Sequence, residues 1–133
     1  MRILHAMPVY APAWQFGGPV LSVSRLCEGL AQQGVDVQVV TTNAGLPELP
    51  SEHLGRPLLR GDVQVTYFPI DRAISPIRSR AMEAALPNVM TQADLVHLSA
   101  IWQPLGLPIQ KAALAHDVPT MHSLRGALGP YSF

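Results

Sequence analysis

The sequence predicts an α/β fold: a Rossmann-like parallel sheet with helices on both of its faces. Short apolar segments rich in β-branched residues alternate with segments whose apolar residues recur every three or four positions. The helical segments are long enough to cross from one parallel strand to the next. Five strands are expected, in the spatial order 3-2-1-4-5. The chain has 133 residues, which is the usual length of one domain.

The first strand is expected at residues 2–7, in the centre of the sheet, because a short apolar run there ends at Pro8. The loop at residues 9–16 carries Tyr10, Trp14 and Phe16. Aromatic side chains in a loop beside a glycine turn either cover the edge of a core or line a ligand pocket. The sequence alone leaves both roles open.

A first helix is expected from Pro19, with Gly34 just past its last turn. No Ser, Thr, Asp or Asn precedes it. Gly17 and Gly18 stand there instead, so no side chain occupies the first free N–H groups. Such a helix start is a place for an anion, most often a phosphate, and a plain tight turn is the alternative. The apolar stripe of this helix comprises Val20, Val23, Leu26, Cys27, Leu30 and Ala31.

Two further strands are expected on one side of the sheet. Residues 35–42 are β-branched and predict a buried strand, whereas residues 62–68 alternate and predict a half-exposed strand at an edge. Residues 44–61 contain several Gly and Pro and no sustained period, so they are expected to form a loop.

A second helix is expected to begin at Ser75 and Pro76, which match the preferred residues at a helix cap and at the first helical position. Pro87 should end or kink it. The last expected elements are a strand at 94–99, a helix at 105–116 and a strand at 118–123. No helix follows to cover that last face, as expected of a fragment or of a chain that needs a partner.

Composition restricts the function classes. The formal net charge is zero and Lys111 is the only lysine, which argues against nucleic acid as a partner. The single cysteine, Cys27, lies on the apolar stripe of the first expected helix, so its side chain is expected to be buried. With one cysteine no disulfide framework is expected, and the expected location is a reducing compartment. The N-terminal apolar run is too short for a signal peptide, and no segment approaches a spanning helix.

Several well-known motifs are not matched. A dinucleotide fold needs G-x-G-x-x-G directly after the first strand and an acidic residue after the second, where Asn43 stands. The P-loop and G-x-S-x-G patterns are not present either. His5, His97 and His122 lie on strands expected to be neighbours, but without a carboxylate at ligand spacing. We therefore expect these histidines to form hydrogen bonds rather than to bind a metal ion.

In a parallel sheet of this type, ligands bind outside the carboxyl ends of the strands. Arg125, beside Gly126, offers donors to a phosphate or a sugar hydroxyl, with a surface salt bridge as the alternative. The features expected at this edge are the aromatic loop, Gly17 and Gly18, the loop with Ser99 and Trp102, and residues 123–126.

Four segments stand in the order and at the separations of a known family: MRILHAMPVYAPAWQFGGPVLSVSRLCEGLAQQGVDVQVVTTNAG, VTYFP, DLVHLSAIWQPLG and VPTMHSLRGALGPYS. The chain thereby resembles the N-terminal domain of a family 4 glycosyltransferase of the two-Rossmann-domain (GT-B) type. The resemblance implies transfer of a sugar from a nucleotide-sugar donor to a glycan or lipid acceptor, usually with retention and without a metal or other cofactor. The N-terminal domain mainly holds the acceptor, and the C-terminal domain mainly holds the nucleotide.

By resemblance, Gly17 and Gly18 approach the donor phosphates. Trp14, Ser99 and Trp102 would contact the acceptor, and Ser99 replaces a histidine that family members tend to have there. Arg125 lies in SLRG, which resembles the family's Ser-Pro-Arg-Gly, where other members have a histidine. His122 is three residues away from that position. The resemblance leaves open whether Arg125 or His122 takes the catalytic role.

The family's C-terminal nucleotide-binding domain, with its paired glutamates, and the later strands of the N-terminal domain have no counterpart in residues 1–133. These residues alone are therefore expected to be a partial domain that transfers no sugar and needs that second domain or a partner chain. The expected setting is the synthesis of polysaccharide or glycolipid in the cytoplasm or at the inner face of a membrane. A non-catalytic Rossmann-like subunit that docks a separate partner is the alternative, and a dinucleotide-binding oxidoreductase is a remote third.

Overall fold

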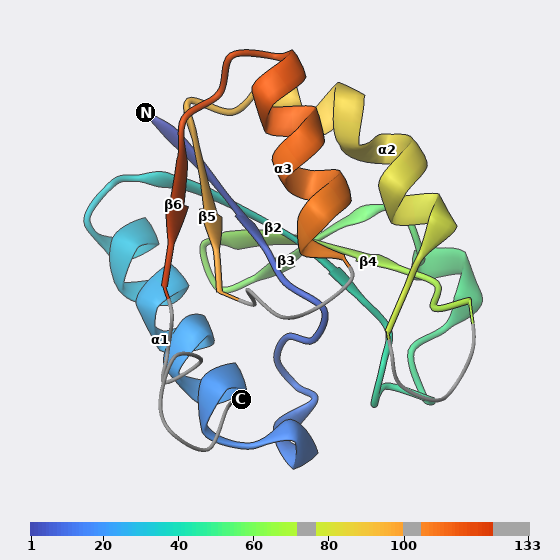
Figure 1. Cartoon of the computed structure of the whole chain (residues 1–133). Coiled ribbons are helices and arrows are strands. Elements are labelled where there is room, and N and C mark those ends of the chain that lie inside the picture. The colour runs from blue at the N-terminus through green and yellow to red at the C-terminus, as the bar shows by residue number, and fades with distance from the viewer. Residues whose placement is uncertain (72–76, 100–104, 124–133) are drawn as a thin grey trace, which may run out of the picture.

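A computed structural model describes residues 1–71, 77–99 and 105–123. The described chain forms a six-stranded sheet with α1 on one face and α2 and α3 on the other (Figure 1). The strands are β1 (Arg2–Ala6), β2 (Asp36–Thr42), β3 (Pro57–Arg60), β4 (Val63–Phe68), β5 (Leu95–Leu98) and β6 (Thr120–His122). The helices are α1 (Gly18–Gln32), α2 (Arg80–Met90) and α3 (Gly106–Ala115), with 3-10 turns η1 (Trp14–Phe16) and η2 (Ser51–His53).

The strands lie in the order β3-β4-β2-β1-β5-β6. All neighbours pair in parallel except β3 and β4, which are antiparallel. The predicted order 3-2-1-4-5 corresponds to β4-β2-β1-β5-β6, and β1 is central, so both predictions are confirmed. Each parallel crossover contains a helix or a long connection, as the predicted βαβ units require.

The prediction of a loop over residues 44–61 is wrong at its end, because β3 pairs with β4. Consequently β4 is an inner strand, and the prediction that it lies at an edge is also wrong. Gly61 and Asp62 form the two-residue connection, and Gly61 has φ +61°. Glycine at the first of two turn residues suits a type II′ hairpin. The strand has only four residues and begins with proline, which explains its weak sequence signal.

The second helix begins later than predicted. Ser79, rather than Ser75, caps α2: its Oγ accepts a hydrogen bond from the backbone N–H of Met82 at 3.1 Å. Ser75 and Pro76 lie outside the described residues, and Ile77 is not helical. Pro87 stands inside α2, so of the two predicted effects, an end or a kink of the helix, the end is wrong. The helix continues because Leu86 and Met90, on either side of it, are buried in the core.

Side chains of alternate strand residues form one core on each face of the sheet. Beneath α1 lie Val37 and Val39 of β2 with Val20, Val23 and Cys27. The predicted helix stripe is confirmed except at Leu26, which is exposed; Leu30 and Ala31 are partly buried. Beneath α2 and α3 lie Leu4, Val40, Val96, Leu98, Met82, Leu86 and Ile109. Burial on both faces explains why the inner parts of β1 and β2 are rich in aliphatic residues, whereas Arg2 and Asp36, at their starts, are charged.

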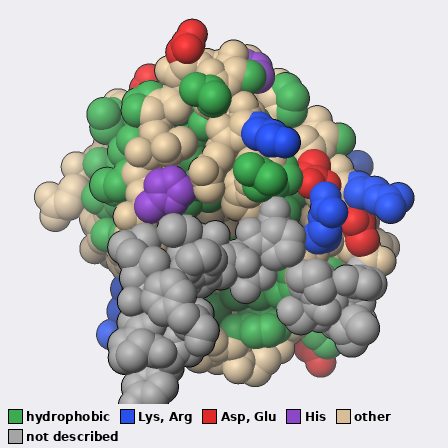
Figure 2. Space-filling model, viewed as in Figure 1, with side chains coloured by type: hydrophobic (Ala, Val, Ile, Leu, Met, Phe, Trp, Pro, Cys, Tyr) green, Lys and Arg blue, Asp and Glu red, His purple; other side chains and the backbone are tan. Residues whose placement is uncertain are grey.

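Figure 2 shows the face that α2 and α3 cover, where side chains of both charge signs gather near α2. Two ion pairs account for part of this cluster: Arg78 with Glu83 at 2.9 Å, and Arg80 with Asp71 at 3.8 Å. Exposed pairs of this kind contribute little to stability. No helix in the described ranges combines the length and the apolar character needed to cross a membrane.

Candidate functional site at the carboxyl edge of the sheet

The carboxyl ends of β1, β2, β4, β5 and β6 lie at one edge of the sheet because these strands are parallel (Figure 1). The loop to α1 leaves this edge from β1, and Ser99 and Ser123 follow β5 and β6. This is the edge at which sheets of this type bind ligands.

A glycine turn opens α1. Gly17 is the N-cap residue with φ +90°, a conformation that glycine adopts without strain, and its N–H donates to the Trp14 carbonyl at 3.0 Å. Gly18 is the first helical residue and Pro19 has no N–H, so Gly18 and Val20 supply the first-turn amides that lack a helical acceptor.

The described residues leave space beside the two glycines. A Cβ atom built on Gly17 or on Gly18 would meet none of the described residues within 4 Å, apart from chain neighbours and the backbone of α1 itself. No side chain caps α1, and its first turn contains no acidic residue. The positive end of the helix dipole is therefore exposed next to two amide donors, which is an arrangement that accepts an anion.

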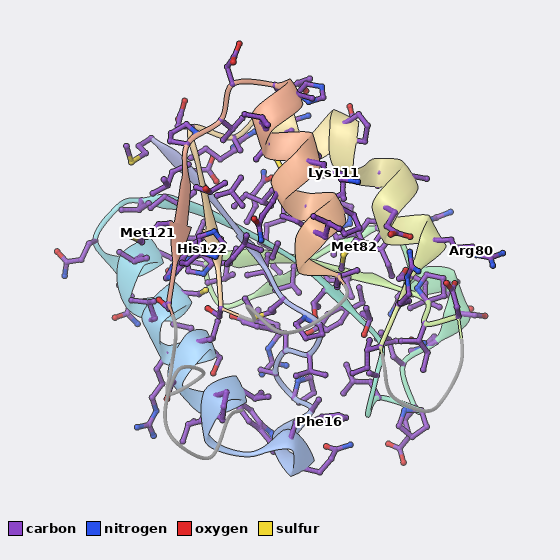
Figure 3. The ribbon with its side chains drawn as sticks, in the orientation of Figure 1. Phe16, Arg80, Met82, Lys111, Met121 and His122 are labelled. Carbon is purple, nitrogen blue, oxygen red and sulfur yellow. The ribbon has the colours of Figure 1, made fainter. Side chains whose placement is uncertain are left out.

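The aromatic residues of the β1–α1 loop divide between the two roles that the sequence left open. Tyr10 is 1% exposed and belongs to the core beneath α1. Trp14 and Phe16 are 49% and 44% exposed and lie in η1, immediately before the glycine turn. Figure 3 labels Phe16 in this turn. Tyr10 therefore covers the core edge, whereas Trp14 and Phe16 are available to a ligand.

Hydrogen bonds from neighbouring strands fix this loop. Thr42 Oγ1 donates to the Pro8 carbonyl at 2.6 Å, and the Tyr67 hydroxyl donates to the buried Ala11 carbonyl. Burial raises the pKa of Tyr67, with a smaller opposing effect from Arg60. Burial, followed by the interaction with Cys27, raises the pKa of Tyr10. Both phenols are therefore neutral near neutral pH, and Tyr67 is held as a hydrogen-bond donor.

The loop after β2 is attached to η1. Gln15 Nε2 donates to the Gly45 carbonyl at 2.8 Å. Gly45 has φ +76°, and a Cβ atom there would lie 2.5 Å from Gln15 Nε2 and 2.5 Å from Phe16 Cε2. Only glycine permits this close approach. Nearby, Asn43 Oδ1 accepts from the Ile70 N–H at 3.0 Å, so the residue that occupies the dinucleotide family's acidic position has a structural role.

At β5 and β6, a buried histidine holds the start of the final segment. His97 Nε2 lies 2.5 Å from Ser123 Oγ, and the Ser123 N–H donates to the Leu98 carbonyl at 2.9 Å. The His5 and His97 rings are 4.5 Å apart between centroids, and both residues are buried. Sequence reasoning did not identify the contact between His97 and Ser123, because it joins positions that only the pairing of β5 with β6 brings together.

The three strand histidines do not share a face. His5 pairs with His97 in register, whereas His97 pairs with Met121 and Leu98 with His122. Since successive residues of a strand point to opposite faces, His122 lies on the other face from His5 and His97. Figure 3 labels His122 on β6. Nowhere in the described ranges do three His, Cys, Asp or Glu side chains come close enough to hold a metal ion.

The predicted site residues divide into two sets. Five of them are described and lie near the carboxyl edge. Trp14, Gly17 and Gly18 lie between β1 and the first turn of α1, Ser99 directly follows β5, and His122 is the last residue of β6. Ser99 Oγ is buried and has no hydrogen-bond partner among the described residues. Trp102 and Arg125 lie outside the described residues, so their convergence with Gly17 stays a prediction.

A pocket near the glycine turn was not predicted from the sequence, because β3, which forms part of the pocket wall, was expected to be a loop. Its volume is about 480 Å³. The residues around it come from the β1–α1 loop, the loop after β2 and the β3–β4 hairpin: Pro12, Gly45, Leu46, Pro47, Glu48, Leu49, Leu58, Leu59, Arg60 and Tyr67. The hairpin signal Gly61–Asp62 between two apolar segments would have pointed to it.

One comparison with known proteins identifies a family. A model of the glycosyl transferase 4-like domain matches residues 17–132, a range that begins at the glycine turn. No curated protein matches the chain. Among solved structures, the C-terminal domain of a hydrogenase from Pyrococcus furiosus is similar, with a TM-score of 0.48 and 18% identity over 92% of this chain and 91% of that one. That TM-score is too low to support an inference. The chain belongs to the glycosyl transferase 4-like domain family.

Proposed function

We propose that these residues form the acceptor-side wall of a glycosyltransferase that moves a sugar from a nucleotide-sugar donor to a hydroxyl of a glycan or lipid acceptor. The observation that carries the proposal is the family match over residues 17–132, which contains the open, glycine-capped start of α1. The start of α1 lies at the edge of the sheet where ligands of such folds bind.

The donor diphosphate would bind at the start of α1. The amides of Gly18 and Val20 are oriented donors, and the exposed helix dipole favours negative charge by about 0.3–1 kcal/mol. Gly17, with φ +90°, has the backbone conformation that glycine adopts without strain, and it places no side chain beside these amides. The lack of a carboxylate in the first turn of α1 supports the same role, because such a carboxylate would repel the phosphates.

The acceptor would lie between the aromatic turn and the end of β5. Trp14 offers an exposed ring on which a sugar can stack. Ser99 Oγ lacks a partner in the described part of the chain, and a sugar hydroxyl would supply one. Trp102 would complete this wall. Arg125 or His122 would act on the reacting sugar, and the contact between His97 and Ser123 would position the segment that carries Arg125.

A second, nucleotide-binding domain would supply the other wall of the cleft. Transfer requires donor and acceptor held in one geometry by groups on both sides, so residues 1–133 alone should transfer no sugar. We place the reaction in the synthesis of polysaccharide or glycolipid in a reducing compartment, in keeping with the single buried cysteine, Cys27. Contact with the inner face of a membrane is part of this proposal.

An NMR titration of the 15N-labelled chain tests the donor site. With UDP-glucose or GDP-mannose, the amides of Gly17, Gly18 and Val20 should shift, whereas those of Gly34 and Gly55, two other glycines with positive φ, should not. The Gly18→Asp variant should lose these shifts, because its negative charge would repel the phosphates. Gly18→Asn is the neutral control and should retain most of the response. Unchanged spectra with both nucleotide sugars, or shifts confined to other elements, would contradict the proposed donor site.

Sugar transfer is tested separately. With radiolabelled nucleotide sugar and n-octyl β-D-glucoside as acceptor, the 133 residues should give no labelled product. Product formation that depends on this chain would show that the second wall is not required. That outcome would leave the glycosyltransferase function in place and remove the requirement for a second domain.

A further inference from the structure

The pocket beside the glycine turn has the size of a ligand site. Its volume of about 480 Å³ lies within the range of roughly 300–1,000 Å³ that small-molecule sites occupy. Leu46, Leu49 and Leu58 line it and are half-buried against the core beneath α1. Its wall is therefore aliphatic and rests on a packed base, which suits the apolar part of a ligand.

Two charged side chains of opposite sign, Glu48 and Arg60, line the same pocket. The ion pairs of the described residues are Arg2–Asp36, Arg78–Glu83 and Arg80–Asp71, and neither Glu48 nor Arg60 takes part in one. A carboxylate only accepts hydrogen bonds and a guanidinium only donates them. Together they leave the net charge of the pocket at zero, and they can bind hydroxyl groups both as hydrogen-bond donors and as acceptors. This chemistry favours an uncharged, hydroxylated group over a phosphate.

The wall of the pocket is connected to the proposed donor site through one hydrogen bond. Its wall residue Gly45 receives the hydrogen bond from Gln15 and is in close contact with Phe16, and these residues lead directly into Gly17. Pro12, in the same loop, also lines the pocket. A ligand in the pocket therefore lies against the loop that shapes the start of α1.

We propose that this pocket binds the acceptor, and that the acceptor is a neutral glycoside with an apolar aglycone. The aglycone lies against Leu46, Leu49 and Leu58, and the sugar hydroxyls bind Glu48 and Arg60. This inference rests on the proposed function, since it assigns the acceptor class of the same site. It extends that site beyond Trp14 and Ser99 to the β3–β4 side of the sheet.

The probe is n-octyl β-D-glucoside below its critical micelle concentration, titrated into the 15N-labelled chain. The amides of Leu46, Glu48, Leu49 and Leu58 should shift together, and glucose alone should bind at least tenfold more weakly because it lacks the apolar part. Leu49→Gln should weaken octyl glucoside binding about tenfold. Leu30→Gln is the matched control: Leu30 is also half-buried against the same core but does not line the pocket.

The charged residues have matched controls as well. Glu48→Gln and Arg60→Gln should each weaken binding about tenfold, because each removes a hydrogen bond to a charged group. Glu52→Gln and Arg56→Gln, at exposed positions that do not line the pocket, should leave it unchanged. Thermal melts of each variant confirm that the fold is intact before binding is compared.

The outcomes separate this inference from the proposed function. Leu49→Gln binding like the wild type, or shifts confined to residues away from the pocket, would overturn the acceptor pocket. The donor site would stand if UDP-glucose still shifted Gly17 and Gly18. If n-octyl phosphate bound as tightly as n-octyl β-D-glucoside, the proposal that the pocket prefers a neutral sugar head group would be overturned. Pocket shifts without any response to nucleotide sugars would support a glycoside pocket and count against the proposed transfer.

Discussion

Gly45→Ala should destabilise the domain and loosen the glycine turn. Gly45 has φ +76°, and the left-handed conformation costs other residues about 1–2 kcal/mol. The new Cβ atom would also lie 2.5 Å from Gln15 Nε2 and Phe16 Cε2. These exposed side chains must move, and the hydrogen bond from Gln15 to the Gly45 carbonyl, which contributes about 1 kcal/mol, is lost. The expected total loss is about 2–3 kcal/mol.

Gly55→Ala is the matched control for the backbone conformation. Gly55 has φ +75°, and apart from its chain neighbours none of the described residues lies within 4 Å of a Cβ atom built there. The control therefore carries the left-handed strain without the contact, and about 1–2 kcal/mol of destabilisation is expected. Urea unfolding followed by circular dichroism gives both free energies of unfolding.

A difference of about 1 kcal/mol or more between the two variants is expected, together with altered chemical shifts at Gly17 and Gly18 in Gly45→Ala alone. Equal destabilisation, with the spectrum of the glycine turn unchanged, would refute the idea that the loop after β2 holds η1 in place. It would also remove the physical connection between the pocket and the donor site.

Three further changes test other parts of the structure. Tyr67→Phe leaves the buried Ala11 carbonyl without its donor and should cost about 1–3 kcal/mol in urea unfolding, with little change in the far-ultraviolet spectrum; an unchanged midpoint would show that this hydrogen bond is not needed. The contribution of Tyr10 and Tyr67 to stability should be constant up to about pH 10 and then fall, because their pKa values are raised in the folded chain and the unfolded chain releases these protons first. The free energy of unfolding in urea should therefore be lower at pH 11 than at pH 8, and Tyr67→Phe should reduce the difference. Pro87→Ala restores the N–H that α2 lacks at an exposed position and should raise the midpoint by the equivalent of about 1–2 kcal/mol, whereas a lower midpoint would show that the ring packs favourably.

Much of the sheet could be predicted because its elements are repeated and locally encoded. The β-branched residues of β2 and the helical spacing of Val20, Val23 and Cys27 each indicate one element, and the preference for parallel crossovers then determines the strand order. Gly17 and Gly18 were predictable for the same reason, since a helix start without a capping side chain is visible in the sequence.

The errors arose where local signals were short or ambiguous. Ser75–Pro76 and Ser79 both resemble helix starts, and only the packing of Met82 and Leu86 into the core favours the second. The four residues of β3 show no clear alternation, so only their pairing with β4 identifies them as a strand.

The parts of the site that could not be predicted depend on tertiary contacts. His97 and Ser123 meet because β5 and β6 pair, although 26 residues separate them in sequence. Glu48 and Arg60 line one pocket because β3 folds back onto β4 beside the loop after β2. No spacing rule in the sequence connects such positions.

A crystal structure of the chain with UDP-glucose and n-octyl β-D-glucoside would test most directly whether donor and acceptor meet at this edge of the sheet. We expect a phosphate oxygen within hydrogen-bond distance of the Gly18 amide and the octyl chain against Leu46, Leu49 and Leu58. A nucleotide bound away from the start of α1, with the glycoside on another face of the sheet, would contradict the assignment of this domain as the acceptor-side wall of a glycosyltransferase.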